Sequence, residues 1–416
     1  MIRFIHTADI HFGMENYGRI DPETGIHSRL LDFKKSFDTC VDYAIANTVD
    51  LFIFAGDAYK TANPSPTQQK LLMQSFMRLY QAKIPVVIVI GNHDNPLSFG
   101  KANALDIFAH LPIDGFHVFA KPNALTIQTK SGPVQIVGIP WPNRHHLALN
   151  AAHALASASE LTQHISESLA KIIVNFAQKI DQTIPSILVG HLTISAGIFS
   201  GSEKRAVYGH DPILLPSQLA ITPFDYVALG HLHRFQNVNP DGIIPIIYSG
   251  SIDRIDFGER KEIKGFCDVT IHEKYRTTFK HIEIDTRPFI QIDVSLNDTH
   301  DQTEQILTEL QKYTLTDAIV KITYEIPTTS TDNVDVKRIQ KHCVDAMYLV
   351  GIIPIRTIQT RAHRDLLRQE MNLETLLHTY FDAHEALKKR ADTLTQKALN
   401  LDEIAHLYEK DETVET

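Results

Sequence analysis

Cysteine is scarce in this sequence, and its scarcity argues against two kinds of site. The 416 residues include three cysteines, which are scattered along the chain: Cys40, Cys267 and Cys343. Because no two of them form a CxxC pair, the sequence argues against a disulfide framework and against a cysteine-based zinc site. A reducing compartment suits such a chain, so we expect a cytoplasmic protein.

Long apolar runs are also missing. No stretch is long enough to span a bilayer. Polar residues interrupt the first ten positions at Arg3, His6 and Asp9, so no signal peptide is expected. The length of 416 residues predicts two or three domains, and an apolar fraction of 43% is ordinary for a folded protein.

Positive charge is in deficit, because 40 Lys and Arg residues oppose 49 Asp and Glu residues, for a net charge of −9. A stand-alone nucleic-acid binder usually carries a basic patch or a high pI, and this average does not suggest one. Metal-binding carboxylates, however, contribute negative charge that bound dications cancel. A partner subunit could also supply a basic surface, so the negative net charge does not exclude a nuclease.

Strand and helix patterns alternate at the start of the chain. Apolar runs at 2–8, 51–55 and 86–90 are typical of strands, and helical spacing covers 28–47 and 67–81. This βαβαβ order predicts a parallel sheet with right-handed crossovers.

Later segments predict more strands and two further domains. We expect β-structure at 116–139 and 243–284, and a helix at about 155–180. A small α+β module follows, then an almost purely helical, highly charged tail. The expected domain bounds are 1–285, 286–362 and 363–416.

Five apolar runs end on residues that bind metals. The endings are Asp9-Ile10-His11, Gly56-Asp57, Gly91-Asn92-His93-Asp94, Gly190-His191 and Gly230-His231-Leu232-His233. Strands buried on both faces form continuous apolar runs, and ligands gather beyond their carboxyl ends in open α/β sheets. Folding would bring these side chains to one rim. Carboxylate oxygens with neutral imidazoles are the donors of a hydrolytic divalent-metal site.

Each ending alone is weak, because an Asp or His near a strand end often caps a helix or satisfies a loop. The segment 91–94 is more telling, since unpaired polar groups at a buried strand end cost about 1–3 kcal/mol each. His231 and His233 stand two positions apart, and in an extended chain they would project to the same side. All five endings in this order favour a site for two metals.

The ordered endings resemble the calcineurin-like metallophosphoesterase superfamily. The flanking residues are similar to its SbcD family, the Mre-eleven-like nuclease subunits of bacterial SbcCD complexes. The segments that carry this narrower likeness are His6–His11, Ala55–Asp57, Tyr226–His233 and Tyr248–Ser251. The resemblance covers about residues 1–285 and implies an α/β fold, a β-sandwich flanked by helices. The later segments match the family's capping domain and helical tail in order and size.

The resemblance also implies a role for each residue of the endings. One metal would be held by Asp9, His11 and His233, the other by Asn92, His191 and His231, and Asp57 would bridge both. His93 would be catalytic, stabilising or protonating the leaving oxygen, as suits an imidazole. The family's metals are usually manganese, although these donors also permit Fe, Zn or Mg. Asp94 would either orient His93 or cap the following turn.

One position departs from the family pattern. Well-known members carry His or Asp three residues after the bridging Asp, where this chain has Lys60. A lysine can pair with a phosphate as a point charge, but it cannot act as a neutral imidazole. The alternative is that Lys60 is an ordinary surface lysine. Phosphodiester hydrolysis is therefore better supported than processive exonuclease cutting.

These observations predict a manganese-dependent DNA exonuclease or endonuclease, the nuclease subunit of an SbcCD-like repair complex. One alternative is a phosphatase or cyclic-nucleotide phosphodiesterase of the same superfamily. Protein phosphatases of this superfamily carry an Arg shortly after the bridging Asp, and no Arg closely follows Asp57 here. The chain also extends far beyond residue 285, which a small phosphodiesterase does not need. The other alternative is a non-catalytic scaffold for an SMC-like ATPase, which the completeness of the ligand set disfavours.

The resemblance implies three partners: DNA, an SMC-like ATPase (SbcC) and a second copy of this chain. An apolar stripe from Leu366 to Leu407 would dock on the ATPase, since exposed stripes of this kind usually mark binding surfaces. It could instead pack on its own domain. Apolar residues within 71–80 and 105–111 would form the homodimer contact, or would belong to the core.

Overall fold

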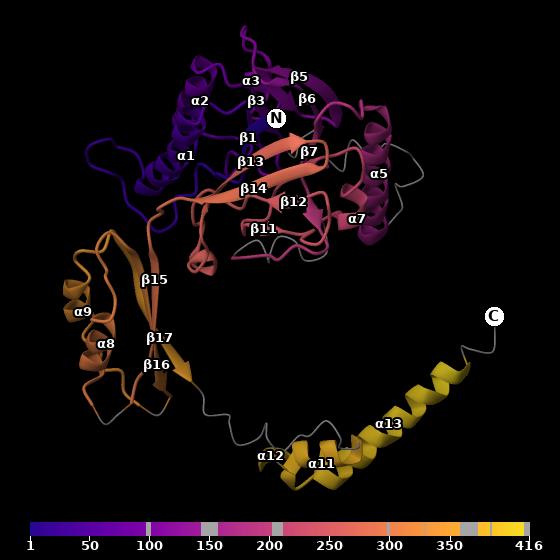
Figure 1. The fold of residues 1–416 in the computed structure, drawn as a ribbon. Coiled ribbons are helices and arrows are strands. Elements are labelled where there is room, and N and C mark those ends of the chain that lie inside the picture. Colours follow the sequence, from indigo (N-terminus) through magenta and orange to yellow (C-terminus); the bar gives the residue numbers. More distant parts are fainter. Residues whose placement is uncertain are drawn as a thin grey trace. The chain divides into compact units, whose positions relative to one another are not determined.

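The computed structural model describes residues 1–96, 101–142, 157–201, 211–297, 300–328, 330–357, 373–382 and 385–411. The chain divides into two compact units. The first contains Met1–Ile292, Gln311–Lys321 and Gln340–Gly351, and the second contains Asp293–Leu310, Ile322–Ile339 and Ile352–Thr416. The candidate site lies wholly in the first unit, whose two large sheets are drawn in Figure 1.

The first sheet contains the predicted βαβαβ unit. Its six strands lie in the order β14 (Arg276–Glu283), β13 (Gly265–Glu273), β1 (Ile2–Thr7), β2 (Leu51–Phe54), β3 (Val86–Val89) and β4 (Phe116–Phe119). Strands β1 to β4 are parallel, whereas β13 pairs antiparallel with β1, and β14 pairs antiparallel with β13. The intervening helices are α1 (Ser28–Ala46) and α2 (Pro66–Gln81). Ser65 and Gln68 form a capping box that starts α2 at Pro66.

The second sheet also has six strands. Their order is β11 (Gln236–Asn237), β12 (Ile246–Tyr248), β10 (Tyr226–Gly230), β7 (Ser186–His191), β6 (Gly132–Ile139) and β5 (Asn123–Thr129). Strands β12, β10, β7 and β6 are parallel to one another. The smaller elements nearby are α3 (Asp106–Ala109), α5 (Ala158–Lys179), β8 (Thr193–Ile194), β9 (Ile213–Leu214), α7 (Pro216–Leu219) and the 3₁₀ helix η2 (Phe257–Glu259).

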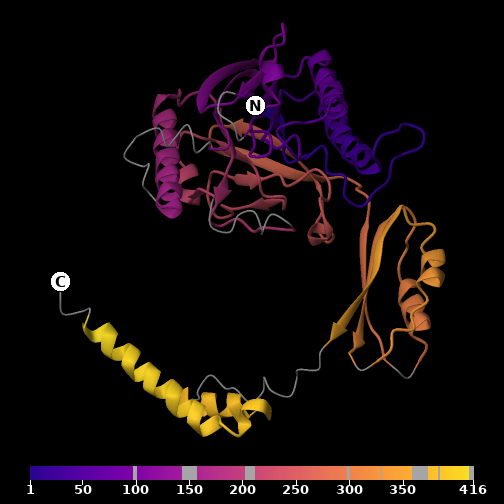
Figure 2. The same ribbon diagram turned by 180° about the vertical axis from the view of Figure 1, so that it is seen from behind.

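The core confirms a four-layer αββα sandwich. Successive residues of a strand point to opposite faces. On β1, Phe4 therefore packs between the two sheets, with Tyr226 of the second sheet at 5.5 Å between ring centroids. Its neighbour Ile5 packs toward α1, in the cluster that contains Phe33 and Phe37. The outer face of the second sheet is covered by α5, and Figure 2 shows α5 on the opposite side of the sheets from α1 and α2.

The predicted α+β pattern also appears after residue 288. A third sheet has the order β15 (Phe289–Ser295), β16 (Ile319–Pro327) and β17 (Tyr348–Thr357). The helices of this region are α8 (Gln302–Leu310) and α9 (Val336–His342). The division between the two units passes through this sheet, and the bounds 286–362 and 363–416 stay predictions.

The tail is helical wherever it is described. Its helices are α11 (Leu373–Asp382), α12 (Glu385–Lys388) and α13 (Ala391–Asp411). The start of the expected apolar stripe, 366–372, lies outside the described residues. Among the helices described, none combines the length and the apolar character that crossing a membrane requires.

Candidate metal centre

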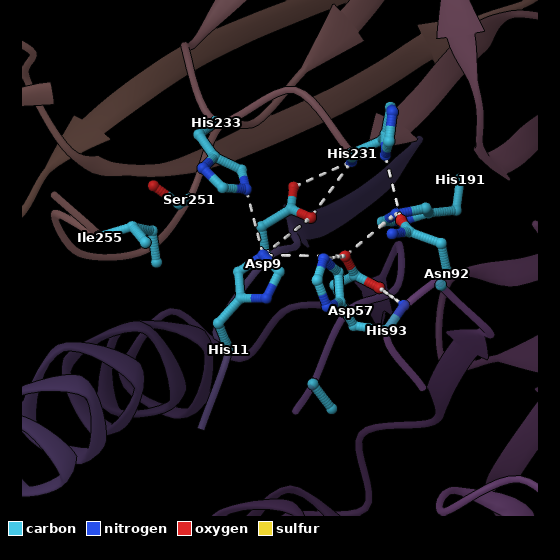
Figure 3. Close-up of polar contacts among 12 residues, drawn as sticks. Asp9, His11, Asp57, Asn92, His93, His191, His231, His233, Ser251 and Ile255 are labelled. Carbon is cyan, nitrogen blue, oxygen red and sulfur yellow. Dashed lines mark hydrogen bonds and ion pairs between the residues drawn. The ribbon is translucent and has the colours of Figure 1, made fainter. Parts of the chain in front are cut away.

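The five sequence endings meet at one rim of the sandwich. They lie at the carboxyl ends of β1, β2, β3, β7 and β10, and Figure 3 shows their side chains pointing toward one another. Six of the seven predicted ligands are buried: Asp9, His11, Asp57, His191, His231 and His233. The seventh, Asn92, is partly buried. The structure therefore brings together all seven side chains predicted from the sequence.

The backbone turns sharply at four of these residues. Positive φ angles occur at Asp9 (54°), His11 (53°), Asp57 (57°) and His231 (103°). Residues with side chains rarely adopt this conformation, which costs on the order of 1–3 kcal/mol each and clusters at functional sites. Because of these turns, the four side chains point into the rim. In a continued strand, successive side chains would instead point to opposite faces of the sheet.

The extended chain expected at His231 and His233 is not found, because β10 ends at Gly230 and the chain turns at His231. Both side chains nevertheless reach the same cluster. Alternation with period two holds only in extended chain. The Nδ1 atom of His231 lies 3.1 Å from Asn92 Oδ1, whereas Nε2 of His233 lies 3.1 Å from Nε2 of His11.

The first group of donors comprises Asp9, His11 and His233, whose ligand atoms lie within 4.8 Å of one another. The Nε2 atom of His11 lies 3.1 Å from Nε2 of His233 and 3.9 Å from Asp9 Oδ1. Metal–nitrogen bonds of about 2.1 Å place neighbouring ligand atoms about 3 Å apart, so this spacing fits a shared cation.

The second group comprises Asn92, His191 and His231. Asn92 Oδ1 lies 3.0 Å from His191 Nε2, so this amide oxygen and two ring nitrogens face one space. Asp57 stands between the two groups, because its Oδ2 lies 3.4 Å from His191 Nε2 and 3.7 Å from His11 Nε2. The donors thus fit two divalent cations, with Asp57 placed to contact both.

Hydrogen bonds behind two of the imidazoles fix how the rings are presented. Nδ1–H of His191 donates to the carbonyl oxygen of Ala55 at 2.8 Å. His233 Nδ1 lies 2.8 Å from Oε1 of Glu259, a carboxylate that the sequence analysis missed. With the outer nitrogen held, Nε2 is the ring atom that faces the other donors and can bind a cation.

Glycines permit the close approach of these loops. A Cβ atom at Gly91 would lie 2.0 Å from Oδ1 and 2.4 Å from the backbone nitrogen of Asp57. A Cβ atom at Gly230 would lie 2.2 Å from the carbonyl oxygen of Ala55. Because backbone is part of both contacts, rotation of a side chain alone would not relieve them.

We therefore expect Gly91→Ala to weaken metal binding by about tenfold or more and to destabilise the fold by about 1–3 kcal/mol, as overpacked sites do. Calorimetric titration with Mn²⁺ and thermal unfolding measure the two effects. The control is Gly25→Ala, where φ is 69° but a Cβ meets nothing within 4 Å. Equal loss of Mn²⁺ affinity in both variants would contradict the proposed contact.

Burial and charge set the protonation that these side chains have without metal. Burial raises the pKa of Asp9 to about 6. Burial lowers the pKa of His191, but the Asp57 carboxylate outweighs it and raises that pKa to about 9. For Asp57 itself, burial acts upward, yet the imidazoles of His191 and His93 hold the pKa below its usual range. Without metal, the His191 ring is therefore protonated on both nitrogens and positively charged at neutral pH.

Cation binding should consequently displace protons. We expect Mn²⁺ affinity to rise by about tenfold per pH unit between pH 6 and 9, because one proton leaves His191, and more steeply below pH 6, where Asp9 is also protonated. Trp141 is the only tryptophan and lies 4.7 Å from His231 between ring centroids, so its emission reports binding. An affinity independent of pH in this interval would contradict the assignment.

His93 lies at the open side of the cluster. Its side chain is 43% exposed, and its Nδ1 lies 2.8 Å from the carbonyl oxygen of Lys60. Because that carbonyl can only accept, Nδ1 carries the hydrogen and the opposite atom, Nε2, lies 4.0 Å from Asp57 Oδ2. An exposed ring nitrogen beside a metal group can donate a proton to a leaving oxygen or orient a phosphate.

Asp94 caps its own turn and joins two loops. It accepts hydrogen bonds from the backbone N–H groups of Gly91, Ala58 and Tyr59 at 3.1–3.3 Å. Burial raises its pKa to about 7. These bonds support the capping alternative over direct orientation of His93.

Two further residues beside the cluster were not predicted. Asp211 Oδ2 lies 3.4 Å from Nε2 of His231, and Trp141 packs against the same ring. Asp211 does not stand at the end of a long apolar run, and Trp141 is not a metal-binding residue. The sequence pattern that located the other side chains therefore does not identify these two.

A known family matches the part of the chain that contains this site. A profile of the family described as calcineurin-like phosphoesterase matches residues 2–235. Among solved structures, a dimetal phosphatase from Danio rerio is similar at 12% identity and a TM-score of 0.41, over 67% of this chain and 95% of that one. A protein of Thermus thermophilus, TT1561, is similar at 10% identity and a TM-score of 0.35, over 67% of this chain and 98% of that one.

Proposed function

The chain belongs to the calcineurin-like phosphoesterase family, and we propose that its metal-dependent phosphoesterase activity cleaves phosphodiester bonds of DNA. One observation carries the proposal: Asp57 lies between two groups of N and O donors, with the exposed ring of His93 beside it. Two bound cations would activate a water and neutralise charge growing on the phosphate. His93 would protonate or stabilise the leaving oxygen.

Several features favour DNA over a phosphomonoester. The residues after Asp57 are buried Ala58 and Tyr59 and then exposed Lys60, so no arginine stands there to grip a terminal phosphate. The chain continues into a third sheet and a helical tail, which a small phosphodiesterase does not need. The segments flanking the site resemble the SbcD nuclease family. On this basis we propose manganese as the metal.

The test compares three classes of substrate, namely DNA, a small phosphodiester and a phosphomonoester, with the full chain and Mn²⁺. We expect cleavage of linear duplex and hairpin DNA, some turnover of a chromogenic phosphodiester, and little turnover of the matching phosphomonoester. Chelation with EDTA should stop all three reactions. Uncut DNA with rapid monoester hydrolysis would favour the phosphatase alternative, and no turnover of any substrate would favour a scaffold.

Lys60 allows a narrower prediction. Its carbonyl oxygen, not its side chain, holds His93, so Lys60→Ala should leave cleavage of the chromogenic diester unchanged. If the ammonium group pairs with a DNA phosphate, the KM for DNA should rise, because about 0.2–1 kcal/mol is typical of an exposed ion pair. The same KM for DNA in both proteins would show that Lys60 is an ordinary surface lysine.

The partners stay proposals. In the tail, Leu373, Tyr380 and Leu401 are exposed at 43%, 49% and 67%, which suits docking on the SMC-like ATPase SbcC. A chain truncated at Arg361 should then no longer co-purify with that ATPase.

For the homodimer, Leu72 and Phe76 belong to the core, while Ile107 is 52% exposed. Light scattering at micromolar concentration tests the dimer.

A further inference from the structure

A buried ion pair lies directly behind one of the candidate metal ligands. Glu259 and Lys264 are 0% and 2% exposed, and Lys264 Nζ lies 2.8 Å from Glu259 Oε2. Glu259 comes from the 3₁₀ helix η2, and Lys264 immediately precedes β13. Neither residue belongs to the five sequence endings, and neither is one of the donors grouped around Asp57.

The Glu259 carboxylate is used on both of its oxygens. Oε1 lies 2.8 Å from Nδ1 of His233. Oε2 accepts from the backbone N–H of Ile255 at 2.9 Å and from Ser251 Oγ at 3.3 Å. Ser251 and Ile255 stand beside His233 in Figure 3. These bonds leave the carboxylate little freedom to turn away from the imidazole.

Lys264 holds the same histidine from its main chain. Its Nζ donates to the carbonyl oxygen of His233 at 3.0 Å and to Ser251 Oγ at 2.9 Å. A third bond, also 2.9 Å, goes to Oε2 of Glu262. The two buried charges therefore fix His233 at both its ring and its backbone.

Stability alone is a weak reason for such a pair. Removing two charges from water costs several kcal/mol per ion, and buried pairs often contribute no more stability than apolar residues of similar size. A carboxylate on the outer nitrogen of a metal-binding imidazole, in contrast, fixes the ring and raises its basicity as a ligand.

We propose that Glu259 is a positioning residue that holds His233 with its Nε2 toward His11 and Asp9, and that Lys264 keeps Glu259 in that place. This inference rests on the proposed metal centre. Glu259 acts through His233 on one of the two cation positions and contacts neither substrate nor the Asn92 group.

The matched comparison is Glu259→Gln with Glu262→Gln. Both glutamates pair with Lys264, but only Glu259 bonds to His233. Titration of the metal-free full chain with Mn²⁺, followed by electron paramagnetic resonance of the free ion, measures both sites. We expect Glu259→Gln to weaken one of the two sites by about 10–100-fold, and Glu262→Gln to leave both unchanged.

Turnover separates positioning from a direct catalytic role. For Glu259→Gln we expect a higher Mn²⁺ requirement, with kcat close to that of the unmodified chain once Mn²⁺ is saturating. Equal losses of affinity in the two variants, or no loss in either, would overturn the proposal. A kcat that stays low at saturating Mn²⁺ would also overturn it.

Folding is controlled separately. Thermal unfolding in EDTA reports whether Glu259→Gln folds, and the double change Glu259→Gln with Lys264→Met removes both charges of the Glu259–Lys264 pair. If both unfold without metal while Glu262→Gln folds, Glu259 serves the fold and the proposal is wrong. If the unmodified chain binds no Mn²⁺, the metal centre itself fails, which is a different result from loss in the variant alone.

Discussion

Replacing Asp57 with asparagine should remove tight binding of both cations and lower phosphodiester hydrolysis by roughly 10³-fold, since a metal's transition-state stabilisation is worth several kcal/mol. Asp57 Oδ2 is the oxygen that stands between His11 and His191, at 3.7 and 3.4 Å. Asparagine keeps the shape but removes the charge that faces both donor groups. Metal analysis after desalting and steady-state turnover measure the two losses.

The control for Asp57→Asn is an equally buried carboxylate away from the rim. Asp225 is 1% exposed and pairs with Lys274 at 2.9 Å. We expect Asp225→Asn to lower the thermal unfolding temperature, because it leaves a charge partly unpaired, yet to retain both metals. Two Mn²⁺ ions bound to Asp57→Asn with the affinity of the unmodified chain would show that this carboxylate does not bridge them.

The arrangement of the sheet was predictable because its signals are local. Continuous apolar runs such as 51–55 and 86–90 mark doubly buried strands, and helical spacing between them marks the crossovers. The start of α2 was predictable from Pro66, and the structure adds the capping box of Ser65. Once the strands are parallel, their carboxyl ends share one edge, so Asp9, Asp57 and Asn92 had to meet.

The parts that could not be predicted depend on how loops turn after the strands end. His231 leaves the extended conformation at φ 103°, and nothing in Gly230-His231-Leu232-His233 encodes that turn in advance. Glu259 reaches His233 across 26 positions that include β11, β12 and η2. No periodic pattern links two residues at such a separation, so the bond depends on packing around η2.

An amphipathic pattern also does not identify the surface against which the apolar face of a helix packs. The apolar residues of α2 could have formed a surface contact, but Leu72 and Phe76 pack in the core against the first sheet. An apolar stripe indicates that one face of a helix is buried, but it does not indicate whether the same domain or another chain buries that face. The same ambiguity applies to α11 and α13, whose partner stays a proposal.

His93→Ala should separate chemistry from metal binding. His93 is the exposed member of the cluster, and its Nε2 lies 4.0 Å from Asp57 Oδ2, so its loss should leave both Mn²⁺ ions bound. DNA cleavage should nevertheless fall by about 10²–10⁴-fold, the contribution typical of a positioned general acid. Metal analysis and single-turnover cleavage of a duplex measure the two properties in one preparation.

The leaving group then identifies what the imidazole does. The alkoxide that leaves DNA needs a proton, whereas p-nitrophenolate leaves a chromogenic diester without one. A general acid at His93 therefore predicts a large loss on DNA and a much smaller loss on the chromogenic diester. Equal losses on both substrates would mean that the ring, held by the carbonyl of Lys60, orients the phosphate and transfers no proton. A loss of Mn²⁺ in His93→Ala would instead place this imidazole among the ligands.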